Sequence, residues 1–388
     1  MPDGAEVVVG RIDTGAFVIL PADGAALLQR MAEGMAPPQA ADWYAAEFGE
    51  PVDVDGFVAA LRELGFVRER GAEALVTGRP ARFQRLGRAI FSPPARAAYL
   101  TVMALWAVLM IRSADLRPAP SHIFFTHSLL LVQVLITFGQ IPLLFLHEGF
   151  HILAGRRLGL PSKLGMSNRW TYIVFETQMN GLLSVPRRKR YLPFLAGMLC
   201  DMLVLAALDG TAELTRTSSG SFSVAGRACL ALAFTVMVRL LWQFELFLRT
   251  DLYYVFATAL NCYDLHDASK ALLWNRIWRI LRRPHRIVDE QLWTDHDRRV
   301  GTWYGPFLVL GVGTLLGITA FVSMPVVVQY FRIAIHNVTS HGIGEALFWD
   351  GFVSLSINGG QVALLVWLAT RKRRRQRGRA QRLIEEVR

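Results

Sequence analysis

Long apolar segments separated by polar, mostly basic stretches dominate the chain from residue 97 onward. A helix needs about 20 consecutive apolar residues to cross the hydrocarbon core of a membrane. Six segments approach or reach this length, the first and third being the shortest: 97–112, 122–147, 191–208, 224–248, 305–330 and 350–370. The pattern predicts a mostly α-helical, polytopic membrane domain at residues 97–370 with about six spans.

The first 78 residues show a different pattern of short elements separated by Gly and Pro. Alternation in EVVVGRIDTGAFVIL predicts two strands around a turn at residues 13–15. FVRER at residues 66–70 is a candidate returning strand. Three amphipathic stretches that each end in glycine predict helices at residues 21–34, 37–49 and 53–65. Residues 1–78 are therefore expected to form a small α+β domain of the winged-helix type.

Composition supports the membrane assignment. Hydrophobic residues make up 53% of the chain and charged residues only 19%, against about 25% in a typical soluble domain. The net charge of +11 would suggest nucleic acid in a soluble protein. Here the basic residues crowd the stretches that flank the apolar segments, namely 79–96, 156–190, 249–300 and 371–382. We assign them to membrane topology and anionic lipid, and expect no nucleic-acid partner.

The distribution of basic residues also predicts orientation. The positive-inside rule places the basic loops, and with them both termini, in the cytoplasm. Residues 79–96 are then a basic linker, and residues 371–388 a basic cytoplasmic tail. The three cysteines lack C-x-x-C spacing, which argues against a disulfide framework and against thiolate zinc. Residues 1–12 do not have the pattern of a cleavable signal peptide.

The segment LFLHEGFHILAG at residues 144–155 places His147, Glu148 and His151 inside an apolar run. On a helix, H-E-x-x-H puts two imidazoles one turn apart on the same face, the spacing that suits two ligands of one zinc ion. The glutamate beside the first histidine can then act as general base. Buried histidines without such a role are uncommon in membrane spans, which favours a metal site over a structural pair.

A catalytic zinc needs a third protein ligand. Asp251 directly follows the fourth apolar segment and is expected at the same membrane depth as the histidines, near the cytoplasmic side. Asp350 begins the sixth segment from the opposite side, about 30 Å away. Topology therefore selects Asp251. Asp201 in the third segment is expected to pair with Arg239 of the fourth, as a structural pair or as support for the site, and Glu245 is the second choice as ligand or polar support.

Three pieces of this sequence together resemble a known family: LHEGFH, then SVPRRKRYLPFLAG, then RTDLYY. They are similar to the site-2-protease-like intramembrane zinc metallopeptidases, especially the bacterial branch of peptide zinc metalloproteases. The resemblance covers roughly residues 120–280. It implies a protein of the bacterial cytoplasmic membrane in which His147, His151 and Asp251 bind Zn²⁺ and Glu148 is the catalytic base. Asn261 is at a position where the family pattern continues after the aspartate.

Two positions depart from the family pattern. Leu252 replaces the glycine that follows the aspartate, and Met198 replaces the proline that follows Ala196 and Gly197. Glycine permits backbone conformations that strain leucine. We therefore expect the aspartate loop to have a different shape here, which puts the third ligand in question.

The N-terminal module resembles the PqqD-like, RiPP-recognition winged helices in its element order and in LPADGAALLQRM and FVAALRELGFV. The resemblance implies that residues 1–78 bind the leader of a precursor peptide as an added strand. The alternative is a regulatory or packing domain. Similarly, segment 170–186 is expected either as a hairpin beside the active site that pairs with substrate or as an ordinary interfacial loop.

The expected function is thus an intramembrane zinc metalloendopeptidase that cleaves a peptide or membrane-associated substrate, in ribosomal-peptide maturation or export. The alternative is a membrane scaffold or export component that binds a precursor peptide without proteolysis. A zinc enzyme acting on lipid or another small substrate also fits the residues.

Overall fold

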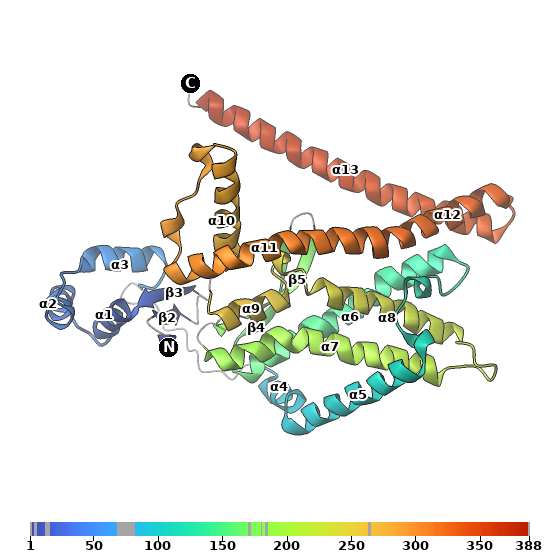
Figure 1. Ribbon diagram of the computed structural model, residues 1–388, viewed down its shortest axis with the longest axis horizontal. Coiled ribbons are helices and arrows are strands. Elements are labelled where there is room, and N and C mark those ends of the chain that lie inside the picture. The colour runs from blue at the N-terminus through green and yellow to red at the C-terminus, as the bar shows by residue number, and fades with distance from the viewer. Residues whose placement is uncertain are drawn as a thin grey trace. The chain divides into compact units, whose positions relative to one another are not determined.

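The computed structural model describes the chain except for residues 1, 4–5, 12–15, 68–81, 170–171, 180, 183–184, 263–264 and 387–388 (Figure 1). It divides into two compact units, each assembled from three stretches of sequence. Unit one contains Met1–Val102, Leu144–Met202 and Gln243–Leu308, and unit two contains Met103–Leu143, Leu203–Trp242 and Val309–Arg388. Four long helices contribute to both units: α5 (Pro93–Arg112), α6 (Leu129–Arg157), α7 (Arg187–Leu214) and α11 (Asp295–Ile318).

Three strands and three helices form the N-terminal part of unit one. The strands β1 (Pro2–Asp3), β2 (Glu6–Arg11) and β3 (Ala16–Pro21) pair antiparallel in that order. The helices α1 (Ala22–Ala32), α2 (Pro37–Phe48) and α3 (Val54–Glu63) follow them. The strand pair and the helices lie where the sequence predicts them, but the turn at 13–15 and residues 68–70 of the candidate strand lie outside the described residues.

Local chemistry sets the ends of these helices. Prolines occupy the first turn of α2, where a missing N–H leaves no hydrogen bond unmade, and Gly49 ends the helix in the left-handed region at φ 76°. The Asp53 carboxylate caps α3 by accepting a 2.9 Å hydrogen bond from the Gly56 N–H. The buried core consists of Leu27, Ala40, Tyr44 and Val54. The small α+β arrangement is present, while its winged-helix identity stays a prediction.

Six helical segments of the described chain are long and apolar enough to cross a membrane. This confirms the polytopic α-helical class, whereas the orientation of the termini stays a prediction. Two of the six had looked short in the sequence, but α5 (Pro93–Arg112) has 20 residues and α7 has 28. The remaining segments are α6, α8 (Val224–Trp242), Asp295–Ser340 and Ala346–Leu368.

Several predicted bounds were wrong, mostly because basic residues continue the helices that apolar residues begin. Arg and Lys are good helix formers, so hydropathy alone underestimates helix length. Helix α6 therefore ends ten residues beyond residue 147, and α13 (Ala346–Glu386) includes most of the predicted tail. The fifth segment is an almost unbroken run of α11 (Asp295–Ile318), the π-helical turn η7 (Thr319–Ser323) and α12 (Met324–Ser340).

Shorter helices fill the connections between the long ones. In unit two these are η1 (Ala114–Leu116) and η2 (Pro120–Ile123). In unit one they follow the early end of α8: η4 (Leu246–Leu248), α9 (Asp251–Leu260), α10 (Leu265–Ile280), η5 (Pro284–Arg286) and η6 (Glu290–Leu292). The predicted fourth span, 224–248, is thus six residues too long, and the chain breaks at Gln243 before the aspartate loop begins.

The predicted basic linker is also partly wrong, because residues Gln84–Ile90 form helix α4. Gly87 lets this helix approach α6 closely, since a Cβ there would lie 2.4 Å from the carbonyl oxygen of Leu153. Phe91 follows in a buried cluster with Ala154 and Ala196. The segment that enters the membrane domain is therefore packed against the histidine-bearing helix.

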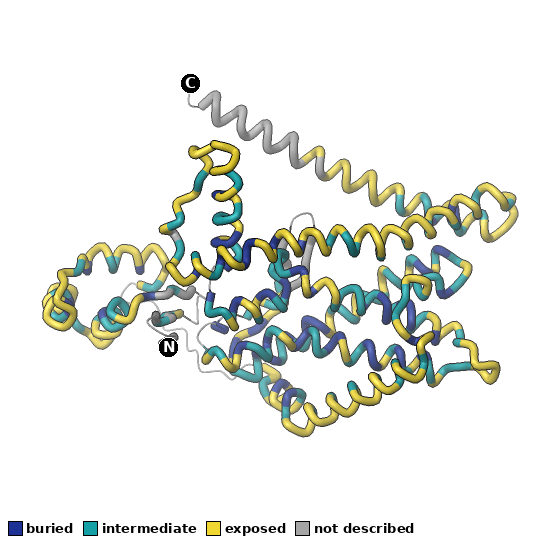
Figure 2. Tube along the Cα trace, viewed as in Figure 1, coloured by how far each residue is buried: buried dark blue, intermediate teal, exposed yellow. Residues whose placement is uncertain are grey.

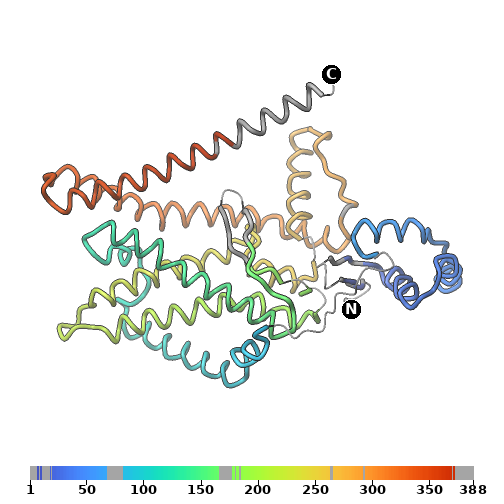
Figure 3. The backbone as a smooth tube through the Cα atoms, turned by 180° about the vertical axis from the view of Figure 1, so that it is seen from behind, coloured from blue at the N-terminus to red at the C-terminus, as the bar shows by residue number. Residues whose placement is uncertain are grey.

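A two-stranded hairpin follows α6 directly (Figure 3). Strands β4 (Ser162–Arg169) and β5 (Tyr172–Met179) pair antiparallel, from Ser162 opposite Met179 to Arg169 opposite Tyr172. The bounds expected for a hairpin, 170–186, were wrong: that range holds only the second strand, β5, of a hairpin that begins at Ser162. Its first strand, SKLGMSNR, is polar and was not recognised as a strand.

Unit two contains the polar contacts that fix the start of α6. The Asp350 carboxylate, from α13, accepts hydrogen bonds from the backbone N–H groups of Leu129 (2.8 Å) and Leu130 (3.1 Å) and from the Ser128 hydroxyl (2.5 Å). It thereby satisfies N–H groups that have no partner within the helix. Elsewhere, α5 buries none of its residues, as expected for a helix that faces lipid (Figure 2).

Candidate metal centre

Two buried histidines of α6 form the centre of the site. His147 and His151 are 4% and 3% exposed and lie one turn apart on one helix face. The apolar run around them forms a continuous helix, so the i, i+4 spacing brings both rings to the same side, with centroids 4.8 Å apart.

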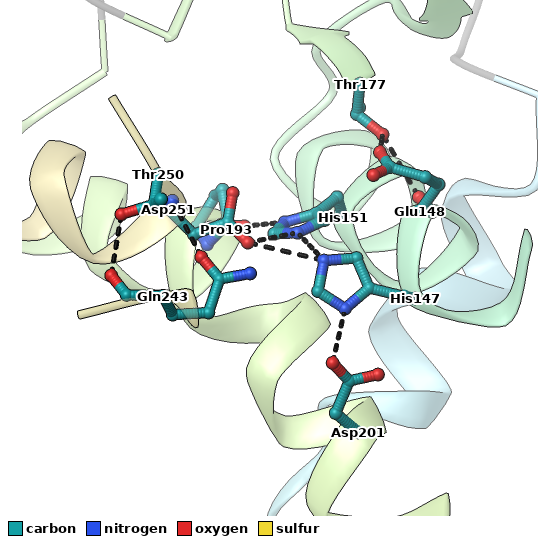
Figure 4. Close-up of polar contacts among 9 residues, drawn as sticks. All are labelled: His147, Glu148, His151, Thr177, Pro193, Asp201, Gln243, Thr250 and Asp251. Atoms are coloured by element: carbon teal, nitrogen blue, oxygen red, sulfur yellow. Dashed lines mark hydrogen bonds and ion pairs between the residues drawn. The ribbon is translucent and has the colours of Figure 1, made fainter. Parts of the chain in front are cut away.

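Helix α7 fixes the orientation of both rings (Figure 4). Nδ1 of His147 lies 3.0 Å from an oxygen of the buried Asp201 carboxylate. Nδ1 of His151 lies 2.7 Å from the backbone carbonyl oxygen of Pro193. Both partners are acceptors, so each Nδ1 carries the proton and donates. Each Nε2 is thereby left with its lone pair, the arrangement that orients metal-binding histidines in proteins.

The break after α8 brings Asp251 to these nitrogens. Arg249 turns the chain in the left-handed region at φ 55°, and Asp251 then begins α9. Gln243 holds the loop at two points: its carbonyl accepts a 2.6 Å hydrogen bond from the Thr250 hydroxyl, and its side-chain oxygen accepts one of 3.1 Å from the Asp251 N–H. Burial acts to raise the pKa of the Asp251 carboxyl, but the positive charge of His151 and His147 in their protonated form outweighs it and holds that pKa below its usual range.

Three possible ligand atoms form a nearly equilateral triangle. The two Nε2 atoms are 3.2 Å apart, and one Asp251 oxygen lies 3.1 Å from Nε2 of His151 and 3.3 Å from Nε2 of His147. In a tetrahedral zinc site with bonds of about 2.0–2.1 Å, neighbouring ligand atoms are about 3.3 Å apart. Either a proton or a metal ion between the nitrogens would relieve the repulsion of their lone pairs. The donor set therefore fits a metal ion in both chemistry and spacing.

Gly197 on α7 leaves room beside this triangle. A Cβ at this position would lie 2.2 Å from Nε2 of His151 and 2.5 Å from Nε2 of His147. Side-chain carbons are essentially never found that close to a nitrogen, so any larger residue would displace the imidazoles or occupy the space in front of them. The glycine is needed here for close approach and not for an unusual backbone conformation.

Glu148 is buried beside the two histidines, with its carboxylate turned toward the hairpin (Figure 4). The Thr177 hydroxyl on β5 lies 2.7 Å from a Glu148 carboxylate oxygen and 3.1 Å from its backbone carbonyl oxygen. This hydroxyl fixes a carboxylate that takes no part in the ligand triangle. Strand β5, from the hairpin that follows the histidine-bearing helix α6, therefore positions the candidate base.

The other residues singled out in the sequence have different places. Glu245 is buried in the turn between α8 and η4, and Asn261 caps the C-terminus of α9 in the left-handed region at φ 55°. Neither belongs to the ligand cluster found among the described residues. Asp350 caps α6 in unit two, as the topological argument required. Leu252 lies in the first turn of α9 with helical geometry, and the different loop shape expected from it stays a prediction.

Sequence reasoning missed Gly197, Gln243 and Thr177. Gly197 was noted only as part of a motif, although a glycine one turn from Pro193 on a span is itself a signal of close packing. Gln243 interrupts an apolar run, which indicates a helix end. Thr177 carried no usable signal, because its role depends on how the hairpin folds back onto α6.

No family model, curated protein or solved structure matches this chain.

Proposed function

We propose that this protein is an intramembrane zinc metalloendopeptidase. The observation that carries the proposal is the ligand triangle of His147, His151 and Asp251 with Glu148 buried beside it. The sequence resemblance to site-2-protease-like enzymes supports the same reaction. Two imidazoles and one carboxylate also suit non-haem iron, but the i, i+4 histidines with an adjacent glutamate favour zinc.

In this proposal Asp201 and the Pro193 carbonyl keep the histidines in the tautomer that binds a metal. The bound Zn²⁺ would supply Lewis acidity to the scissile carbonyl and lower the pKa of the attacking water. Glu148 takes the proton of that water and returns it to the leaving amine. Thr177 is a positioning residue, because its hydroxyl holds the carboxylate in the orientation from which it can accept the proton.

The hairpin suggests how a peptide is presented. Among the described residues β4 and β5 pair only with each other, so no other described strand occupies either outer edge. An extended substrate that pairs with such an edge forms hydrogen bonds with its own backbone N–H and C=O groups. These bonds matter because unpaired backbone groups are costly inside a membrane. Since β5 carries Thr177, this mode would bring a peptide alongside Glu148.

The N-terminal sheet offers a second place for a peptide. In the described sheet β2 is central and β3 pairs only with β2. We propose that the leader of a ribosomally made precursor adds to this edge and delivers the peptide for cleavage, in maturation or export at the bacterial cytoplasmic membrane with both termini in the cytoplasm.

The test compares wild type with Glu148→Gln in cells that lack the native copy of the protein. New peptide N-termini from membrane proteins and small precursor peptides are labelled and identified by mass spectrometry. We expect termini that depend on wild type and disappear with Glu148→Gln, while a matched surface variant, Glu213→Gln, retains them. If Glu148→Gln gives the same termini as wild type, the protease proposal fails. Intact peptide export without any dependent cleavage would favour the scaffold.

A further inference from the structure

Four helix ends of unit one surround a cavity of about 490 Å³ that shares no lining residue with the metal centre. The cations come from α4, from the first turns of α5 and α7, and from the last residue of α6. They are Arg88, Arg96, Arg157, Arg188 and Lys189. No carboxylate is among the described residues that line the cavity. Its volume is within the range of small-molecule sites.

Among the residues that the structure describes, these cations have no counter-charge. None of the five side chains forms an ion pair or a hydrogen bond with another described residue. Like charges around one cavity repel one another, which is unfavourable. An anion bound inside the cavity would attract all of them and make the electrostatic energy favourable. Helices α5 and α7 begin at the cavity while α4 and α6 end there, so the helix dipoles offset one another and the field comes from the side chains. Guanidinium groups are suited to the bidentate binding of phosphate oxygens.

Position and apolar lining select a lipid as the occupant. The cavity lies at the basic ends of α5, α6 and α7, three candidate membrane spans, where phospholipid headgroups are found. Phe91, Leu158 and Leu192 complete the lining and offer an apolar wall to a glycerol backbone and the first carbons of an acyl chain.

We infer that this cavity is a binding site for the phosphate headgroup of an anionic phospholipid of the cytoplasmic leaflet. A bound headgroup ties α4 and α5 to the ends of α6 and α7. The site goes beyond the proposed peptidase activity and does not depend on a bound metal, so it can be tested by lipid binding alone.

The test uses the full-length protein in nanodiscs of phosphatidylcholine that contain a minor fraction of phosphatidylglycerol. After transfer to a neutral detergent, retained phosphatidylglycerol is counted by mass spectrometry, and the melting temperature is measured with and without the lipid. Arg157→Gln/Arg188→Gln removes two lining cations, and the control Arg276→Gln/Arg283→Gln removes two exposed cations that do not line the cavity.

We expect wild type and the control to retain phosphatidylglycerol and to gain thermal stability from it. Removing two lining cations should weaken binding about thirtyfold, since each contributes roughly a fivefold factor. If that variant is poorly folded, Arg88→Gln/Arg96→Gln on the exposed side tests the same expectation. Equal loss in the lining and control variants would mean diffuse surface attraction and overturn the site. Stabilisation by inorganic phosphate or glycerol phosphate but not by phosphatidylglycerol would overturn the lipid assignment.

Discussion

Replacing Gly197 with alanine should weaken zinc binding strongly without unfolding the protein. The added Cβ would lie 2.2 and 2.5 Å from the metal-facing nitrogens of His151 and His147, so the rings must move. Their other nitrogens are held by the Pro193 carbonyl at 2.7 Å and by Asp201 at 3.0 Å. Movement therefore costs one or both of these buried hydrogen bonds, each of about 1–3 kcal/mol. A net loss of about 2–4 kcal/mol corresponds to zinc affinity lower by about thirtyfold to a thousandfold.

The assay is competition for zinc between the detergent-purified protein and a fluorescent chelator. Gly149→Ala is the matched control, because Gly149 is on the neighbouring helix inside the motif and its added Cβ would have no atom within 4 Å. Alanine is also a better helix former than glycine, so neither variant should lose helical content. Circular dichroism and gel filtration check this point.

Wild-type zinc affinity in Gly197→Ala would refute the reasoning, because it would mean that the metal does not lie between the histidines and α7. Equal loss in both variants would instead attribute the effect to alanine in any of these helices. Only a loss of zinc affinity that is confined to Gly197→Ala supports a metal held between the two histidines and α7.

Further predictions concern the neighbours of the site. Asp201→Asn should lower zinc affinity about ten- to a hundredfold, as measured by chelator competition, because the new side chain holds the His147 ring less firmly. Thr177→Val should lower kcat for cleavage about tenfold with little change in KM and no change in zinc content, since it frees Glu148. Asp350→Ala should cost roughly 0.5–2 kcal/mol of stability in denaturant unfolding in detergent, with zinc content unchanged. Zinc affinity should fall as pH is lowered from about 8 to 5, because imidazoles must be deprotonated to bind, whereas the pKa of Asp251 lies below its usual range and that ligand stays ionised.

Much of the fold could be predicted because its elements are local in origin. Apolar runs and glycine stops predicted the spans and the N-terminal helices, since each depends on residues a few positions apart. Helix ends were less predictable: α6 and α13 continue through arginines that a hydropathy pattern assigns to loops. The polar strand β4 was missed because its pairing with β5, and not its own composition, makes it a strand.

The residues of the site that are brought together by their spacing along one helix could be predicted from the sequence. H-E-x-x-H places both histidines on one face of any helix, and topology alone separated Asp251 from Asp350. Gly197 and Gln243 could not be predicted in their roles, because each acts through atoms that only the fold brings close. The left-handed turn at Arg249 that brings Asp251 to the histidines had no signal in the sequence, because arginine rarely adopts that conformation.

The most direct test of the metal centre is the zinc content of the purified protein. Wild type, Asp251→Ala and Glu148→Gln are purified in detergent, and metal per folded chain is measured by mass spectrometry. We expect about one zinc in wild type and in Glu148→Gln, because the glutamate is not a ligand, and almost none in Asp251→Ala. A folded wild type without zinc, or an Asp251→Ala variant that retains it, would contradict the metal centre proposed here.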